Sequence, residues 1–472
     1  MKNYQLRPLY YILLAGMLWG CKKELNVYPT TSEVDGNVIV DAKSAATALN
    51  GVYYQFADAG LDVNSVPSIK WSDLNEAIPS ELSGLLTNSS GGTLNTHSYK
   101  ASSYEAPLIW TYGYAIVNAA NGFLKNIEPV TSITDSVKQE MMAEAKFLRA
   151  YANSELLLYY GQYYNVNSAY GIILRNEFVT PDNIQLPRST VQACYDSIVS
   201  DLNTAIADLP PVNTQIAYAT SWAAKLLMAR VLINRGVSGD YAQVISLTND
   251  LITNGPFALE SSLQNLFWTR GLTSTEVILG VQPYATQDYK YSNYQFYAQY
   301  VPSDSMMSLF NGDPRLSWIA ETVAAAYGTQ PELTKYYPGS VTTIAPTAIA
   351  ENSYALRLTE AYLLEAEALT LSGGSLAQAK TLLETVLSNA GVTDLSAVEA
   401  QTTAAGLQLQ IVEEEMRNFV GEAGQDWYAL RRLPLATVQA MVPTLGSQDL
   451  YILPIPLSEM TANEKMVQNP NY

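Results

Sequence analysis

The chain has 472 residues, of which 48% are hydrophobic and 15% are charged, a composition typical of folded proteins rather than disordered ones. Its net charge of -18 argues against nucleic-acid binding, because proteins that bind phosphates neutralise them with Lys and Arg. Its 2 cysteines exclude a disulfide scaffold. Tyrosine is common, at 33 residues against 9 Phe, and its apolar ring with a polar tip suits wet surfaces and sugar-like ligands.

The first segment has the proportions of a secretion signal. Lys2 and Arg7 precede an apolar run that is too short to span a bilayer. The run ends in LWGC, which resembles a bacterial lipobox and implies cleavage before Cys21 and acylation, for example with palmitate, of its amine and thiol. We therefore expect a lipoprotein signal peptide at 1–20 and a lipidated tether at 21–40. The alternative is an ordinary signal peptide with an incidental cysteine.

Helical periodicity then predicts a series of amphipathic helices. Asp41 is the expected N-cap of the first, and Ser136 and Ser189 are expected to begin two capping boxes. The predicted helices cover 41–57, 108–127, 137–160, 190–208 and 403–420. Two long stretches, 76–107 and 256–350, lack periodicity, and loops of this length inside a folded body are usually functional. We call them the first and second insertions.

Two segments are predicted to form helical hairpins, 219–255 and 353–391. The helix that begins the second is apolar nearly all round and is expected to be buried. Arg357, Glu360 and Glu367 form its polar stripe, at spacings that would let opposite charges meet. Small residues recur at matching positions of both hairpins, as tetratricopeptide-type pairs require. The predicted fold is mostly α, with tetratricopeptide-like hairpins forming one scaffold over 41–472, although two unrelated hairpins remain the alternative.

Several segments together resemble the SusD/RagB family. They include EAKFLRAYANSELLLYYGQ from residue 144, PSDSMMSLFNGDPRL from residue 302 and the closing YILPIPLSEMTANEKMVQNPNY from residue 451. Trp427, Tyr428 and Arg432 fit the family pattern, whereas Asp426 replaces its usual Arg and Ala429 its usual Asp. This departure predicts the loss of one ion pair from the scaffold.

The resemblance implies a cell-surface lipoprotein, anchored in the outer membrane by its lipid. Such a protein captures an oligosaccharide, or sometimes a peptide, and delivers it to a SusC-like TonB-dependent transporter. The resemblance implies neither a cofactor nor a nucleic-acid partner. A lipid-anchored glycoside hydrolase and a structural repeat adaptor that binds no ligand are the alternatives.

Candidate ligand-binding residues come from chemistry, because sugar faces stack on aromatic rings and their hydroxyls bond to amides and acids. Each candidate taken alone is more often structural than ligand-binding. His97, the only histidine, is expected to be solvated, and Glu413–Glu415 is interpreted as the solvated side of a helix rather than a metal site. The candidates are Trp71, Asn95 and Tyr99 around the first insertion, and Trp268, Tyr284, Tyr289 and Tyr291 in the second.

Catalysis lacks a recognisable motif in this sequence. There is no G-x-S-x-G, H-E-x-x-H, P-loop or EF-hand pattern. A glycosidase needs only two positioned carboxylates, so the 44 Asp and Glu residues leave that alternative open. The sequence predicts a binding protein rather than an enzyme.

Overall fold

The computed structural model describes residues 38–325, 328–337 and 346–472. The predicted signal peptide, Cys21 and most of the tether lie outside the described residues, as do parts of the second insertion. Within the described part of the chain, no helix is long and apolar enough to cross a membrane.

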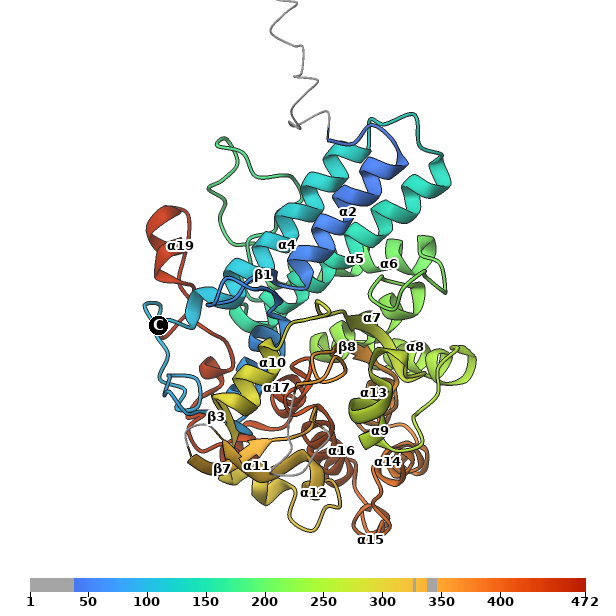
Figure 1. Ribbon diagram of the computed structural model, residues 1–472, viewed down its shortest axis with the longest axis vertical. Helices are drawn as coiled ribbons and strands as arrows, with labels where there is room; N and C mark the ends of the chain where they lie inside the picture. The colour runs from blue at the N-terminus through green and yellow to red at the C-terminus, as the bar shows by residue number, and fades with distance from the viewer. Residues whose placement is uncertain (1–37, 326–327, 338–345) are drawn as a thin grey trace, which may run out of the picture.

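The body is a succession of antiparallel helices, each packed on the next (Figure 1). The contacts run from α4 to α5, α6, α7 and α8, cross the second insertion to α13, and continue to α14 and α16, while α2 packs on α4 and α5. This arrangement confirms a mostly α scaffold. The main helices are α2 (Ala42–Phe56), α4 (Ala106–Ile127), α5 (Asp135–Tyr160), α6 (Val191–Asp208), α7 (Ser221–Arg235), α8 (Asp240–Asn254), α13 (Leu358–Leu371), α14 (Leu376–Asn389) and α16 (Ala404–Phe419).

The helix starts show which capping predictions were right. Asp41 caps α2 in a capping box, as predicted. Ser136 lies inside α5, whose N-cap is Thr134. The N-cap of α6 is Thr190, whose hydroxyl accepts a hydrogen bond from the amide of Ala193. Ser189 is not the N-cap, and its backbone N–H and C=O form hydrogen bonds with residues 172 and 171.

The second predicted hairpin begins later than expected. Ser353–Arg357 is not helical but forms strand β8, which pairs antiparallel with β4 (Val277–Val281). All five residues of β8 are buried, so the sequence shows no period that would separate strand from helix. From Leu358 onward the prediction holds: α13 is buried on nearly every side, and Ser375 caps α14.

The charged residues of the polar stripe, Arg357, Glu360 and Glu367, form their ion pairs with other elements and not with one another. Arg357 contacts Glu276 and Glu422, which come from other parts of the chain. Glu360 binds Arg230 of α7, and Glu367 binds Arg432. These charges therefore tie separate elements together.

The interpretation of Glu413–Glu415 as a solvated side is wrong for two of the three residues. Glu414 and Glu415 are buried. Glu414 binds Arg315, and Glu415 shares Arg432 with Glu367. Charged residues are rarely buried unless paired, and these pairs explain the burial.

The two insertions contain short elements instead of structureless loops. Strand β3 of the first insertion (Leu86–Asn88) pairs with β5 of the second (Tyr300–Pro302), so segments more than 200 residues apart lie side by side. The other strand pairs are β1 (Ala59–Leu61) with β2 (Pro67–Ile69), and β6 (Ala320–Ala325) with β7 (Gly328–Leu333). The remaining helices are η1 (Asp73–Ala77), α3 (Ile78–Leu82), α9 (Leu263–Asn265), η2 (Leu266–Arg270), η3 (Gly271–Thr273), α10 (Tyr289–Tyr291), η4 (Ser292–Phe296), α11 (Asp304–Leu309), α12 (Leu316–Ile319), α15 (Ser396–Glu399), α17 (Gln425–Leu430), α18 (Leu435–Met441), η5 (Gln448–Tyr451) and α19 (Leu457–Ala462).

Candidate ligand-binding cleft

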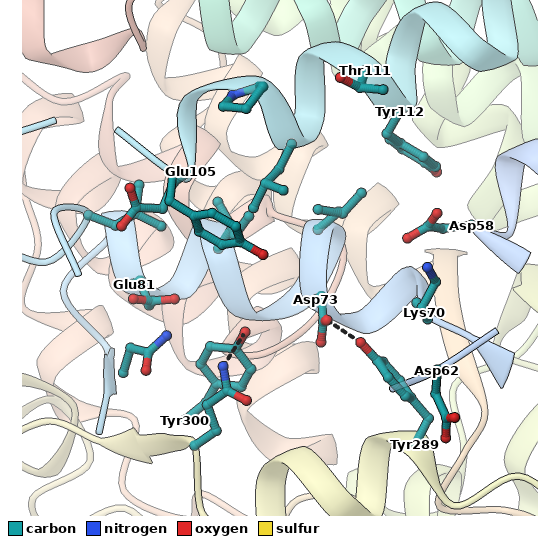
Figure 2. Close-up of a pocket in the computed structure, with 18 of the residues that line it drawn as sticks. Asp58, Asp62, Lys70, Asp73, Glu81, Glu105, Thr111, Tyr112, Tyr289 and Tyr300 are labelled. Atoms are coloured by element: carbon teal, nitrogen blue, oxygen red, sulfur yellow. Dashed lines mark hydrogen bonds between the residues drawn. The ribbon is translucent and has the colours of Figure 1, made fainter. Parts of the chain in front are cut away.

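A cleft of about 860 Å³ opens where the two insertions meet. Figure 2 shows the start of α4 crossing one side, with η1 and α3 opposite it. The β1–β2 hairpin contributes to one end, and Tyr289, Gln299 and Tyr300 come from the second insertion. This volume falls within the range of small-molecule sites.

The charged side chains that line the cleft are mostly carboxyl groups, and tyrosines accompany them. Lys70 is the one basic side chain among the lining residues that the structure describes. Tyr104 is 81% exposed, whereas Tyr112 and Tyr300 are buried. The carboxyl groups belong to Asp58, Asp62, Asp73, Glu81 and Glu105, and the rings to Tyr104, Tyr112, Tyr289 and Tyr300.

Asp73, at the start of η1 just before the first insertion, contacts the second insertion inside the cleft. The hydroxyl of Tyr289 donates a hydrogen bond to Oδ2 of Asp73, and Nδ2 of Asn293 lies 3.0 Å from Oδ1. Burial raises the pKa of Asp73 to about 6, although both hydrogen bonds oppose that shift. At neutral pH the group is largely ionised and accepts from both neighbours.

Glu81 is held in the wall of the cleft by the helix that carries it. The hydroxyls of Ser80 and Ser83 donate to Oδ2 of Asp426, at 2.6 and 2.8 Å, which fixes α3 on α17. Within the described residues these two hydroxyls are the hydrogen-bond partners of the Asp426 carboxylate. Burial raises the pKa of Asp426 to about 6.

The side chain of Glu81 is almost entirely buried, and its carboxyl group lies at the surface of the cleft without a protein partner in the described structure. The residue is 2% exposed, and its side chain has no hydrogen bond or ion pair within the described part of the chain. Burial, followed by the charges of Glu105 and Asp73, raises its pKa to about 8. Glu81 is therefore mostly protonated at neutral pH.

The charges are unevenly distributed along the cleft. Figure 2 places Asp58, Asp62 and Lys70 toward one end and Glu81 and Glu105 toward the other. Lys70 opposes the burial that raises the pKa of Asp58. No basic group is among the causes of the raised pKa of Glu81.

Only one of the candidate residues predicted from the sequence lines this cleft, namely Tyr289. Trp71 and Tyr99 are buried in the core and present no surface to a ligand. The side-chain amide of Asn95 is occupied by the carbonyls of Glu81 and Leu86, so it shapes the first insertion from behind.

The other aromatic candidates of the second insertion are dispersed. The indole of Trp268 donates to the carbonyl of Lys335 at 3.1 Å and packs on Trp318. Tyr291 packs against Tyr337, and Tyr284 is 37% exposed outside the cleft. The second-insertion cluster predicted from the sequence is therefore not a single surface.

The prediction that His97 is solvated is wrong. The imidazole is 4% exposed, with Nδ1 2.9 Å from the hydroxyl of Thr444 and Nε2 donating to the carbonyl of Leu82 at 3.0 Å. Burial lowers its pKa to about 4. His97 is a neutral structural link between the first insertion and the segment before η5.

Sequence reasoning missed most of the residues that line the cleft. It searched the insertions for aromatic rings and amides, whereas the charged side chains of the lining are mostly carboxyl groups. Glu81 and Glu105 both lie in the first insertion, and a search for carboxylates there could have found them. Asp58 and Asp62 precede that insertion, and no pattern in the neighbouring sequence marks them as residues of the cleft.

Comparison with known families and structures agrees with this architecture. A family model described as "Starch-binding associating with outer membrane" matches residues 30–233. A second, described as "SusD family", matches residues 328–444. The chain belongs to the SusD/RagB family.

A SusD-like protein of Bacteroides ovatus is 26% identical over 183 residues, which cover 37% of this chain and 32% of that relative. The match thus spans about a third of the relative's length. A SusD superfamily structure from Bacteroides thetaiotaomicron is 22% identical, with a TM-score of 0.74, over 92% of this chain and all of that one.

Two further SusD-type structures are described by what they bind. A putative sugar binding protein of Bacteroides vulgatus has a TM-score of 0.74 at 21% identity. A laminarin-binding SusD-like protein has a TM-score of 0.69, also at 21% identity. Each covers 92% of this chain and 100% of its own, and these likenesses show the shared fold.

Proposed function

We propose that this SusD-family chain captures an oligosaccharide in the cleft between its two insertions. The observation that carries the proposal is the convergence of both insertions on one cavity lined by tyrosines and carboxyl groups. Carboxylates accept hydrogen bonds from sugar hydroxyls, and the exposed ring of Tyr104 offers a flat apolar face. The family description as starch-binding supports a glycan rather than a peptide.

We further propose that the protein is anchored by a lipid on Cys21 at the outer-membrane surface and delivers its ligand to a TonB-dependent transporter. The family description as associating with the outer membrane supports this location. The basic residues and short apolar run before Cys21 support the anchor. Radiolabelled palmitate incorporation that is lost in Cys21→Ala, and copurification of a barrel-type transporter with the intact lipoprotein, test these two points.

The binding proposal is tested by calorimetry with a panel of neutral, amino and acidic oligosaccharides. We expect saturable binding of at least one glycan, and we expect Tyr104→Ala and Tyr289→Phe to weaken it. Phe296→Ala is the matched control, because Phe296 is 44% exposed but does not line the cleft. Binding that is unchanged by both cleft variants would place the site elsewhere.

A glycoside hydrolase is the second candidate, and the acidic cleft is the observation that favours it. Glu81 is protonated and Asp73 is ionised at neutral pH, a division that general acid and base chemistry requires. Incubation of each bound glycan with the protein, followed by measurement of reducing ends, separates the two functions. Stable glycan supports capture, whereas turnover that Glu81→Gln abolishes supports hydrolysis.

A further inference from the structure

The cleft has a charge imbalance that restricts its ligand. Its lining holds five carboxyl groups against Lys70, and Lys70 lies with Asp58 at one end. At the other end lie Glu81 and Glu105 (Figure 2), and no basic group is among the causes that shift the pKa of Glu81. An anionic ligand would be repelled there, and a cation would be attracted.

The state of Glu81 is a separate observation that points to a missing partner. A carboxyl group that the protein leaves without a hydrogen bond at the wall of a cavity can bond only to water or to a ligand. Glu81 is 2% exposed, lines the cavity and has no partner within the described residues. Glu105, by contrast, accepts from the amide and hydroxyl of Thr93, at 2.9 and 3.0 Å. The unsatisfied group faces the space that a ligand would fill.

We propose that the Glu81–Glu105 end of the cleft binds a protonated amine, and that the captured ligand is an oligosaccharide containing an amino sugar. This inference rests on the glycan-capture function proposed above and specifies its ligand class. An ammonium group supplies hydrogen-bond donors to Glu81 and a positive charge between the two carboxyl groups. Tyr104, adjacent in sequence to Glu105 and 81% exposed, supplies a ring for the face of the sugar.

Binding should release a proton. In the free protein Glu81 carries its proton at neutral pH, because burial and the charges of Glu105 and Asp73 raise its pKa to about 8. An ammonium beside Glu81 favours the carboxylate, so the acid ionises, the ion pair forms and one proton passes to the solvent. The other titratable groups that line the cleft are Asp58, Asp62, Lys70, Asp73, Glu105, Tyr104, Tyr112, Tyr289 and Tyr300.

The experiment compares a glucosamine tetramer with its fully N-acetylated form and with a glucose tetramer of the same linkage. Acetylation removes the positive charge and leaves the sugar ring intact, as it does for lysine. Calorimetry at pH 7 in buffers of different ionisation enthalpy measures affinity and proton release together. We expect the glucosamine tetramer to bind about tenfold or more tightly than either neutral tetramer, and to release up to about one proton.

Two variants assign the effect to this end of the cleft. Glu81→Gln should remove the proton release and most of the preference for the amine, while binding of the neutral tetramers persists. Glu105→Gln should reduce the preference and keep the proton release, because Glu81 still ionises. Glu399→Gln, a change at an exposed position outside the cleft, is the matched control and should alter neither. Thermal melts of each variant show that it is folded.

The outcomes separate this inference from the function on which it rests. Neutral tetramers that bind as tightly as the amine without proton release, or tighter binding of a uronic acid oligomer, overturn the amino-sugar assignment and leave glycan capture standing. Trilysine that binds with proton release while no oligosaccharide binds overturns both, because the ligand is then a basic peptide. Persistence of the amine preference in Glu81→Gln also overturns the assignment.

Discussion

The hydroxyl of Tyr289 donates a hydrogen bond to the carboxylate of Asp73, and this contact joins the second insertion to the start of η1, just before the first insertion, inside the cleft. Tyr289→Phe removes it without changing the ring. A hydrogen bond to a charged group contributes about 1.5–3 kcal/mol to stability, so the variant should remain folded with a lower free energy of unfolding. Because Asp73 then loses a group that positions it in the cleft, we also expect glycan affinity to fall. Tyr218→Phe is the control, because its hydroxyl bonds to Asn50 outside the cleft. Calorimetry and thermal melts check both, and equal binding by the two variants would contradict the prediction.

Tyr104→Ala tests the exposed ring at the mouth of the cleft. The ring is 81% exposed, so its removal should leave the free energy of unfolding within about 0.5 kcal/mol of the parent value. If a sugar stacks on it, affinity should fall by about tenfold. Calorimetry measures the affinity and urea unfolding the stability. A stability loss without an affinity loss would assign Tyr104 to packing.

Glu81→Gln should change the pH dependence of stability. The pKa of Glu81 is about 8 in the folded protein and near 4.5 when unfolded, so the folded state binds more protons between these values. The contribution of Glu81 to the free energy of unfolding is fully present below about pH 4.5. It is lost as the pH rises through about 8, where the buried acid must ionise. Relative to the parent, the variant should gain roughly 2–4 kcal/mol between pH 5 and pH 9. Parallel urea-unfolding curves across this range would contradict the buried acid.

His97 gives a direct test because it is the chain's only histidine. Its folded pKa of about 4 lies below the ordinary 6.5, so it should stay neutral until the pH falls well below 6. Its stabilising effect is present above about pH 6.5 and is lost as the pH falls toward 4. Imidazole NMR of the untagged protein should show a single resonance that does not titrate between pH 6 and pH 8. A midpoint near 6.5 would mean a solvated ring.

Glu422→Gln tests the charge network behind the second hairpin. Glu422 binds Arg357 at 2.6 Å and Lys335 at 2.7 Å, and all three residues are buried. Removing the shared carboxylate leaves two buried cations undercompensated, which should cost about 3–5 kcal/mol of unfolding free energy. Glu399→Gln, at an exposed position, should cost less than about 0.5 kcal/mol. Equal urea midpoints for the two variants would contradict the structural role.

The sequence predicted the scaffold well because most of its helices carry a clear period and local capping signals. Asp41 caps the helix that it was expected to cap, whereas Ser136 and Ser189 lie within two residues of the observed N-caps. Strand β8 escaped detection because it is buried throughout and its partner β4 lies about 75 residues earlier. A run without polar alternation does not indicate whether it is extended or helical.

The cleft was harder to predict because its parts converge only in three dimensions. Tyr289 was identified as a candidate, but its partner Asp73 lies 216 positions earlier. Glu81 appears in the sequence as an ordinary acidic residue, and its burial depends on the contact of α3 with Asp426. Long-range contacts of this kind leave no local pattern.

The first insertion rests on residues that the ribosome adds much later. Tyr99 donates to the carbonyl of Leu450 and stacks on Tyr472, and His97 contacts Thr444. During synthesis, the loop behind Glu81 therefore acquires these supports only after more than 340 further residues have been translated. A nascent chain that is halted before residue 444 contains the segments of α2 to α18 but lacks the residues that support the wall of the cleft. The contacts that shape the wall of the cleft are thus completed only after nearly all of the helical segments have been translated.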